Sequence, residues 1–396
     1  MKWLPLVVVA LLTLFVFRGE AGTLGQKLEV LTALSTHGFQ NVDAVFEGDT
    51  VIVFYENRGY RTETQAMNVV ITLLDSILSP TMDAVLVVHH QSLPVLVAEI
   101  PRPLRLGTQP VGGVSFSTGA LTSSLSGAVL RNRSQFKFSL VQGFSYHAIL
   151  GNFEDAWKPQ LNWIPELQFS PWHGGLITGA VYVRLWNEMK DEGYREHANN
   201  WKLGWLVFNQ LWRFPNTVFV STTIGQFDGD RYGGELQAKG YFHADQLALE
   251  GHLGYVSYSQ WADRHWTYND LSAGDVVGSL AVEYRYLLYD LTLRVQYATY
   301  LYGDRGWEFS MNREFGDLQI GFFGLNTEAG INAGFRVLVP LLPTRYMNPN
   351  HLFQVRPADA IRYEYRGRTF VRGAQSYRNP VNISDWLMYY HPGLWN

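Results

Sequence analysis

The sequence predicts a mainly β protein, an outer-membrane antiparallel β-barrel of about twelve strands that follows a small α+β domain. Three observations lead to this prediction: an N-terminal export signal, long segments of alternating polarity, and connections that alternate between short and long. The 396 residues include 22 Tyr, 23 Phe and 13 Trp, whereas only 17% are charged. Tyr and Trp suit membrane–water interfaces, because each ring has an apolar body and a polar edge.

Residues 1–21 are typical of a secretory signal peptide. Lys2 precedes an apolar run from Leu4 to Phe17, and Gly19 and Ala21 are the small residues of a cleavage site. The run is shorter than the roughly 20 residues that a membrane-spanning helix needs, so we expect cleavage rather than retention as an anchor. No other stretch of the sequence is apolar for long enough to span a membrane as a helix, so membrane residence would require a barrel or surface attachment.

Residues 24–106 are expected to form a periplasmic α+β domain. Leucines recur at helical spacing near its start and are followed by Gly38, and a second amphipathic helix is expected over 63–78. A hairpin follows each helix, over 40–56 and 83–100. This order gives an αββαββ domain with both helices on one face of a sheet.

His89 and His90 lie where the second hairpin is expected to turn. A metal-binding pair is one interpretation of two adjacent histidines. Neighbouring strand residues point to opposite faces of a sheet, however, so the sequence favours a solvated turn.

Residues 107–134 are expected to form a linker, because the chain here is rich in Pro and Gly. The barrel is expected over 135–340. Its β segments are longer than the usual 5 to 6 residues of soluble strands and match the roughly 9 to 11 residues of a membrane strand. They lie near 135–147, 160–169, 175–186, 200–211, 216–226, 233–243, 246–257, 277–288, 291–302, 306–314, 317–325 and 329–340.

The connections between these segments also indicate a membrane barrel. Short turns such as PWHG, RFPN, HADQ, YD and FGD alternate with longer connections such as NEMKDEGYREHANN and SQWADRHWTYNDLSAGD. Outer-membrane barrels have short periplasmic turns and long external loops, whereas a sandwich has no reason to keep this parity.

The alternation within a strand predicts which side chains face lipid. In DLTLRVQYATYLYGD, Leu293, Val295 and Tyr297 alternate with Arg294 and Gln296. The apolar positions are expected to face lipid and the polar positions the lumen. The charged or ionisable residues expected to line the lumen are Lys202, Glu235, Lys239, Glu250, His252, Glu283, Arg285, Arg294, Glu308 and Arg336.

Several strings in this sequence resemble the YjbH family of exopolysaccharide-biosynthesis outer-membrane proteins, relatives of components of group 4 capsule systems in Gram-negative bacteria. The resemblance covers about residues 24–345 and is carried by GFQNVDAVFEGDTVIVFYENRGYR, FDGDRYGGELQAKGYFHADQLALEGHLGY and GDRGWEFSMNREFGDLQIGFFGLNTEAGINAGFRVLVPL. It implies a barrel that helps to assemble or export a secreted polysaccharide. Its partners would be outer-membrane lipid, the polysaccharide and other assembly proteins.

The chain departs from the longer members of that family. It contains one barrel and no cysteine for lipidation, and residues 341–396 have no predicted structure. A barrel of about twelve strands with charged side chains inside is narrow, because the diameter grows with strand number. A hydrated polysaccharide would therefore need a cleared lumen or a partner.

The sequence does not predict an enzyme or a cofactor. It contains none of the common catalytic motifs, although His252 with Glu250, or His265 with Ser259, is an imaginable acyl-hydrolase pair. Lumen packing for the first histidine and a surface loop for the second are the simpler interpretations. The formal net charge of -4, without a basic run, argues against a nucleic-acid partner.

Two further features have open interpretations. Asp228 and Asp230 fit either a calcium site or an acidic external loop, of which the loop is commoner. Trp261, Trp266 and Tyr268 are expected in an external loop. There they would stack on sugars in a transporting barrel, or anchor partners if the barrel is a non-transporting scaffold.

Overall fold

The computed structural model describes residues 24–102, 113–117, 129–150, 157–188, 201–214, 217–262, 264–348, 352–367 and 373–395. The signal segment lies outside these ranges. The chain is mainly β, as predicted from its alternating segments, and its strands form two sheets of five and fifteen strands. Among the described residues, no helix has the length and apolar character needed to span a membrane.

The smaller sheet is built from the N-terminal part of the chain. A helix at residues 24–36 is followed by β1 (Gln40–Glu47), β2 (Thr50–Glu56), α2 (Glu63–Ile77), β3 (Asp83–His90), β4 (Leu93–Ile100) and β5 (Gly113–Ser115). The strands lie in chain order, and β2 pairs with β3 in parallel. Thr62 caps α2, because its hydroxyl accepts a hydrogen bond from the backbone N–H of Gln65. The apolar face of α2 packs on the sheet through buried residues that include Ala66, Val70 and Leu74.

The expected linker contains structure that belongs to this sheet. Within 107–134, strand β5 pairs with β4, and Arg131 forms an antiparallel bridge with Val42 of β1. The prediction of an independent linker is therefore wrong for the described residues 113–117 and 129–134. Long-range pairing determines their structure, and local Pro and Gly content does not reveal it.

The expectation of a solvated histidine turn is also wrong. His89 is 3% exposed, and the turn residues Gln91 and Ser92 are buried as well. The carbonyl oxygen of Gln91 accepts a hydrogen bond at 2.8 Å from the N–H of Gly174, in the turn directly before β8 of the larger sheet. This contact between sheets removes the turn from solvent.

The larger sheet follows the chain order through twelve long strands, and each overlaps a segment predicted from the sequence. They are β6 (Phe138–Leu150), β7 (Trp157–Phe169), β8 (Gly175–Asn187), β9 (Trp201–Phe214), β10 (Val218–Phe227), β11 (Arg231–Phe242), β12 (Leu247–Ala262), β14 (Asp275–Tyr286), β15 (Leu291–Thr299), β16 (Arg305–Phe315), β17 (Leu318–Thr327) and β18 (Gly330–Pro340). Neighbouring strands in this series are antiparallel.

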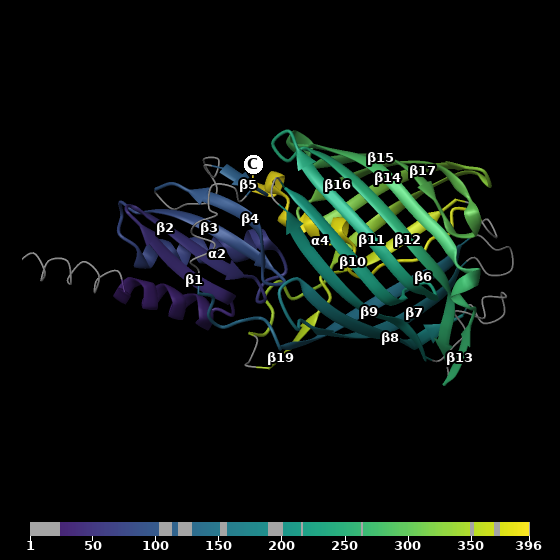
Figure 1. The fold of residues 1–396 in the computed structure, drawn as a ribbon, viewed down its shortest axis with the longest axis horizontal. Helices are drawn as coiled ribbons and strands as arrows, with labels where there is room; N and C mark the ends of the chain where they lie inside the picture. The colour runs from purple at the N-terminus through teal and green to yellow at the C-terminus, as the bar shows by residue number, and fades with distance from the viewer. Residues whose placement is uncertain are drawn as a thin grey trace, which may run out of the picture.

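One short segment pairs with both ends of this series. Strand β19 (Phe353–Pro357) pairs in parallel with β6, and β20 (Ala360–Arg366) pairs with β18. Only Ala358 and Asp359 separate β19 from β20. The sheet curls so that its first and last long strands both lie beside this segment (Figure 1).

The longest expected loop is partly a hairpin. Strand β12 continues to Ala262, and β13 (His265–Tyr268) folds back on it, so that Trp261 pairs with Trp266. Trp261 therefore lies in β12, and Trp266 and Tyr268 lie in β13. The cross-strand pairing of aromatic residues stabilises such a hairpin.

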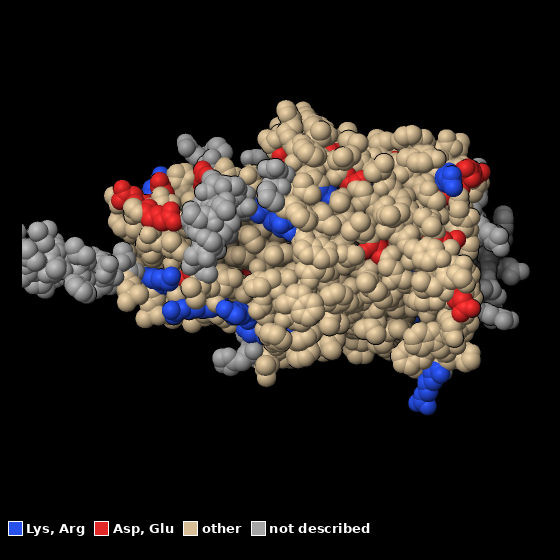
Figure 2. All heavy atoms as spheres, viewed as in Figure 1, with Lys and Arg blue, Asp and Glu red and all other residues tan. Residues whose placement is uncertain are grey.

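The outer face of the large sheet is apolar. Leu249, Val282, Val295 and Phe309 are directly paired across four successive strands, and each is between 44% and 52% exposed. Figure 2 shows few charged side chains over the middle of this surface in the view drawn. Polar residues of the same strands such as Glu250, Glu283 and Arg294 point to the inner face.

The C-terminal residues, whose structure the sequence left open, enter the space inside the curled sheet. After β20 the chain forms α4 (Ile383–Leu387) and the short helices η6 (Met388–Tyr390) and η7 (Pro392–Trp395). Figure 1 shows α4 behind strands β10 and β11. Leu387, Tyr390 and Trp395 share a hydrophobic core with the N-terminal sheet.

Candidate functional site

The N-terminal sheet and its two helices, which we call the cap, lie against one end of the curled sheet (Figure 1). The cap contacts four of the short turns predicted from the sequence. Gln91 contacts the turn at Gly174, and Arg61 forms an ion pair with Asp317. The carbonyl oxygen of Phe116 accepts a hydrogen bond from Arg213. The backbone N–H of Phe116 donates to the carboxylate of Asp245 at 3.2 Å. The cap therefore covers the end of the sheet at which the short turns lie.

A buried polar cluster joins the cap to the region before β6. The carboxylate of Glu56 accepts hydrogen bonds from Asn41, from the hydroxyl of Ser134 at 3.0 Å and from the backbone N–H of Ser92 at 3.0 Å. Arg58 lies 3.8 Å from the same carboxylate and donates to Ser139 of β6 at 2.6 Å. Charge-assisted hydrogen bonds of this kind fix an orientation more firmly than neutral ones.

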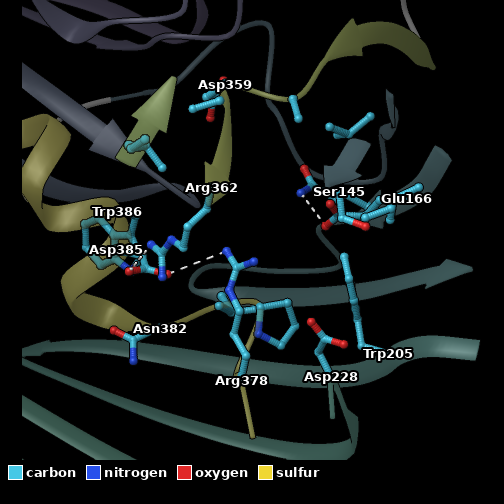
Figure 3. A pocket seen from close by; sticks show the side chains of 18 of the residues that line it. Ser145, Glu166, Trp205, Asp228, Asp359, Arg362, Arg378, Asn382, Asp385 and Trp386 are labelled. Carbon is cyan, nitrogen blue, oxygen red and sulfur yellow. Dashed lines mark hydrogen bonds and ion pairs between the residues drawn. The ribbon is translucent and has the colours of Figure 1, made fainter. Parts of the chain in front are cut away.

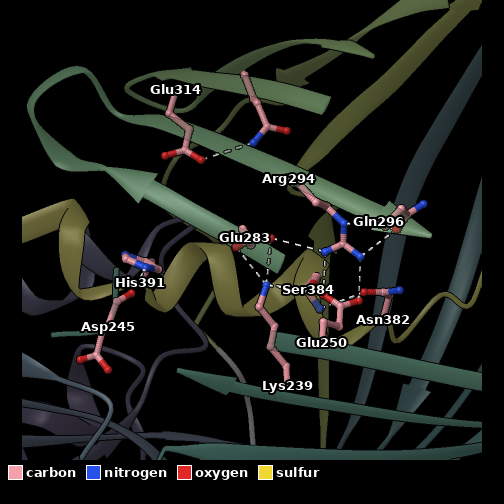
Figure 4. Close-up of polar contacts among 11 residues, drawn as sticks. Lys239, Asp245, Glu250, Glu283, Arg294, Gln296, Glu314, Asn382, Ser384 and His391 are labelled. Carbon is pink, nitrogen blue, oxygen red and sulfur yellow. Dashed lines mark hydrogen bonds and ion pairs between the residues drawn. The ribbon is translucent and has the colours of Figure 1, made fainter. Parts of the chain in front are cut away.

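Eight of the ten residues expected to line the lumen have an ionic partner on the inner side of the large sheet, and the other two, Glu235 and His252, lie next to each other. Four of them form a central group (Figure 4). Lys239 Nζ lies 3.0 Å from Glu283 and 3.7 Å from Glu250, and Arg294 Nη1 lies 2.7 Å from Glu250 and 3.4 Å from Glu283. Two cations and two anions compensate each other here, which buried charges require.

The other predicted residues form separate pairs around this group. Glu235 lies 3.1 Å from His252, Lys202 lies 3.3 Å from Asp230, and Arg285 pairs with Glu314. In a further group of three, Arg336 lies 3.1 Å from Glu308 and 2.7 Å from Glu364 of β20.

The C-terminal segment contacts these charges. Ser384 hydrogen-bonds both Lys239 and Glu250. The hydroxyl of Tyr377 donates to Glu235 at 2.7 Å, and the amide of Asn379 donates to the same carboxylate at 2.6 Å. Much of the space within the curled sheet is therefore filled by the chain's own C-terminus.

A cavity of about 660 Å³ remains beside this segment. It extends along β8 from Leu176 to Tyr182, a distance of about 20 Å at 3.3 Å per residue. Rings from the sheet, from the connection between β18 and β19 and from the C-terminus line it, and they include Tyr146, Tyr182, Trp205, Tyr346, Trp386 and Tyr389. Its volume falls in the range of about 300 to 1,000 Å³ that is common for ligand sites.

Asp385 lies between two guanidinium groups at the wall of this cavity (Figure 3). It is 2.8 Å from Arg362 of β20 and 3.7 Å from Arg378 of the C-terminal segment. The carboxylate thus links the wall of the sheet to the segment inside it.

The cap contains two ionisable groups whose burial changes their protonation. Burial raises the pKa of Glu63 to about 8, although a hydrogen bond from Tyr55 at 2.7 Å opposes the rise. Burial lowers the pKa of His89 to about 4. Both groups are therefore largely neutral at pH 7.

The structure does not assemble the imagined hydrolase pairs. His252 contacts Glu235 at 3.1 Å. Ser259 is paired with Tyr268, whereas His265 is paired with Ala262 at the other end of the hairpin. A nucleophile and its base must lie within hydrogen-bond reach, and this register separates them.

Asp228 and Asp230 have protein partners. The hydroxyl of Tyr182 donates to Asp228 at 2.9 Å, and Lys202 neutralises Asp230. Within the described ranges, no group of three His, Cys, Asp or Glu side chains is arranged to hold a metal ion.

The site residues that sequence reasoning missed lie in the C-terminal segment: Tyr377, Asn379, Ser384 and Asp385. Only Asp385 lies in the aromatic and polar tail DWLMYYHPGLWN, which lacks strand alternation, and no sequence pattern marks the other three. Comparisons of this chain with protein-family models, with curated proteins and with solved structures find no match.

Proposed function

We propose that the large sheet is a closed β-barrel of the bacterial outer membrane, with the cap in the periplasm, and that the protein takes part in assembling or exporting a secreted polysaccharide. The observation that carries the membrane proposal is the division of the two faces of the sheet. The row from Leu249 to Phe309 would face lipid, whereas Lys239, Glu250 and Arg294 would face the lumen. A lipid-facing apolar band and a polar interior are the features of such barrels.

Closure of the sheet is directly testable, because the chain contains no cysteine. A Cβ atom at Gly143 of β6 would lie 3.7 Å from the Cβ of Ala358, within the range of about 3.5 to 4.5 Å found in disulfides. The double variant Gly143→Cys, Ala358→Cys should form a disulfide in oxidising conditions. Failure of the pair to react, with both thiols accessible, would exclude closure at this seam.

Membrane residence has its own test. The mature protein should fractionate with the outer membrane and migrate faster on gels when it is not heated. Recovery as a soluble periplasmic protein would exclude the membrane barrel even if the disulfide formed.

The polysaccharide role is supported by the sequence resemblance and by the cap. The cap covers the end of the sheet with the short turns, where a periplasmic domain would meet assembly partners. Deleting the gene should abolish the surface polymer, and expressing the chain again should restore it. Unchanged polymer in the deletion strain would refute this role.

A non-transporting scaffold is the second candidate function, and the filled interior favours it. The C-terminal segment hydrogen-bonds the central charges, and the cap covers one end of the sheet. Ala360 lines the remaining cavity, so Ala360→Trp should narrow it. Normal surface polymer with this variant, at matched outer-membrane levels, would favour the scaffold, whereas lost polymer would favour passage through the interior.

A further inference from the structure

We infer that residues 374–382, the plug, form a displaceable segment that shuts the interior of the barrel, and that residues 383–395, the root, which begin with helix α4, keep it attached to the cap. This inference rests on the proposed barrel and adds a way of regulating it. It is drawn from the different kinds of contact that the two parts of the C-terminus make.

The plug is held mainly by polar contacts from several strands. Tyr377 and Asn379 donate hydrogen bonds to Glu235, Asn379 also donates to Thr223, and the backbone N–H of Arg378 donates to the carbonyl oxygen of Asp228 at 2.9 Å. Water can replace such partners when a segment leaves, so each hydrogen bond contributes little net free energy. Apolar contacts also exist, because Tyr377 and Val381 pack beside Val256 and Val277.

The root is held by burial of apolar surface instead. Leu387 is fully buried, and Tyr390 and Trp395 join the core of the cap. The ring of Trp386 stacks on His90 of β3 with centroids 4.4 Å apart. Leaving this core would expose large apolar side chains to water, which is far less favourable than exchanging hydrogen bonds. The plug is therefore the part that moves, and the root is the part that stays.

The interior has room for this movement. The cavity of about 660 Å³ lies directly beside the plug, and Arg378, Pro380 and Asn382 form part of its lining. The plug can shift into this space without displacing any strand.

Asp385 acts as an electrostatic latch on this movement. Arg378 belongs to the plug and Arg362 to the wall, and the carboxylate lies between their guanidinium groups. Without the carboxylate, two like charges would face each other across the boundary between plug and wall. Like charges at short range in a partly buried site repel each other, so the plug should open more often.

The test measures how often the interior becomes accessible. Thr223 is 1% exposed on the inner face of β10, and Asn379 of the plug donates a hydrogen bond to its hydroxyl at 3.0 Å. In the otherwise cysteine-free chain, Thr223→Cys places a thiol beneath the plug. A membrane-impermeant methanethiosulfonate reagent, applied to the full chain in lipid vesicles, reports exposure of this thiol as a labelling rate.

Two variants break the latch from opposite sides. Asp385→Asn removes the carboxylate from the root, and Arg378→Gln removes its partner from the plug. Each should raise the labelling rate by about tenfold or more, because labelling follows the population of the locally open state. Arg313→Gln is the matched control, since Arg313 is exposed on the outer face and its change should leave the rate as it was.

A second reporter separates opening from unfolding. Ala66 is fully buried in the core of the cap, and the thiol of Ala66→Cys should stay protected in both latch variants. Equal labelling of both reporters would mean that the variants unfold the protein, and an unchanged rate at the Thr223→Cys thiol would mean that Asp385 does not hold a mobile plug. Either result overturns the inference. The proposed barrel is judged separately, by the Gly143–Ala358 disulfide and by membrane fractionation.

Discussion

Placing a charge in the middle of strand β15 should distinguish a membrane barrel from a soluble sheet. Val295 is the fifth of the nine residues of β15, so about 13 Å of strand separates it from either end. With a tilt of about 40°, this corresponds to about 10 Å of depth, near the centre of an apolar band about 25 Å tall. Its side chain is 44% exposed between Val282 and Phe309.

The expected cost of Val295→Arg follows from this depth. A guanidinium group near the bilayer midplane destabilises a membrane barrel by about 2 to 4 kcal/mol. Gln296 is the neighbouring control, because its side chain donates to Glu308 at 2.8 Å on the inner face. Gln296→Arg can form an ion pair with that carboxylate and should change the free energy of unfolding by less than about 1 kcal/mol.

The measurement is urea-induced unfolding from lipid vesicles, followed by tryptophan fluorescence, with each variant compared at matched lipid composition. The reasoning requires a clear difference between the two substitutions. If Val295→Arg and Gln296→Arg had equal effects, the outer face of β15 would not lie in lipid.

Three further predictions concern charge and backbone geometry. Because the pKa of Glu63 is raised to about 8, the stability contributed by its neutral form is present below about pH 4.5 and is lost as the pH rises to 8. Glu63→Gln should therefore reduce the dependence of the melting temperature on pH between pH 5 and 8. The same pH dependence in the variant and the wild type would contradict the assignment. Lys239→Met leaves an excess of buried negative charge and should destabilise the protein by about 3 to 5 kcal/mol. Adding Glu283→Gln should recover part of this loss. Additive losses in a double-mutant cycle would show that Lys239 and Glu283 do not interact. Gly225 has φ +139°, and a Cβ atom there would lie 2.2 Å from a backbone oxygen. Gly225→Ala should therefore reduce the fraction of folded protein on unheated gels. Gly324→Ala should not, because no atom lies within 4 Å of a Cβ atom at Gly324.

The strands were predictable from the sequence because alternation is a local property. Each of the twelve long strands overlaps a segment in which polar and apolar residues alternate. The same alternation separates Arg294 from Val295, which point to opposite faces of β15. The alternation does not predict which charged residues form ion pairs. Glu250 of β12 pairs with Arg294 of β15 because of the register in which β12, β14 and β15 are aligned.

The position of the C-terminal segment was not predictable in this way. Its contacts join residues far apart in the chain, such as Tyr377 with Glu235 and Trp386 with His90. The periodicity of polar and apolar residues along the sequence does not predict contacts between residues so far apart. The burial of His89 was missed for the same reason, because it depends on a turn of the cap docking against another sheet.

The pairing of β19 and β20 with the two ends of the sheet determines an order of folding. Phe138 pairs with Phe353, so β6 has no partner on this edge until more than half of the chain has followed it. Contacts between such distant residues are slow to form, because a long loop must close before they are made. Residues 373–395 follow β20 in the chain, yet Tyr377 and Ser384 contact the inner face of the sheet, so docking of this segment before β20 completes its ladder with β18 would avoid threading it through an end of the proposed barrel. A chain truncated before Phe353 would keep two unpaired strand edges, at β6 and β18, which are the sites at which aggregation begins.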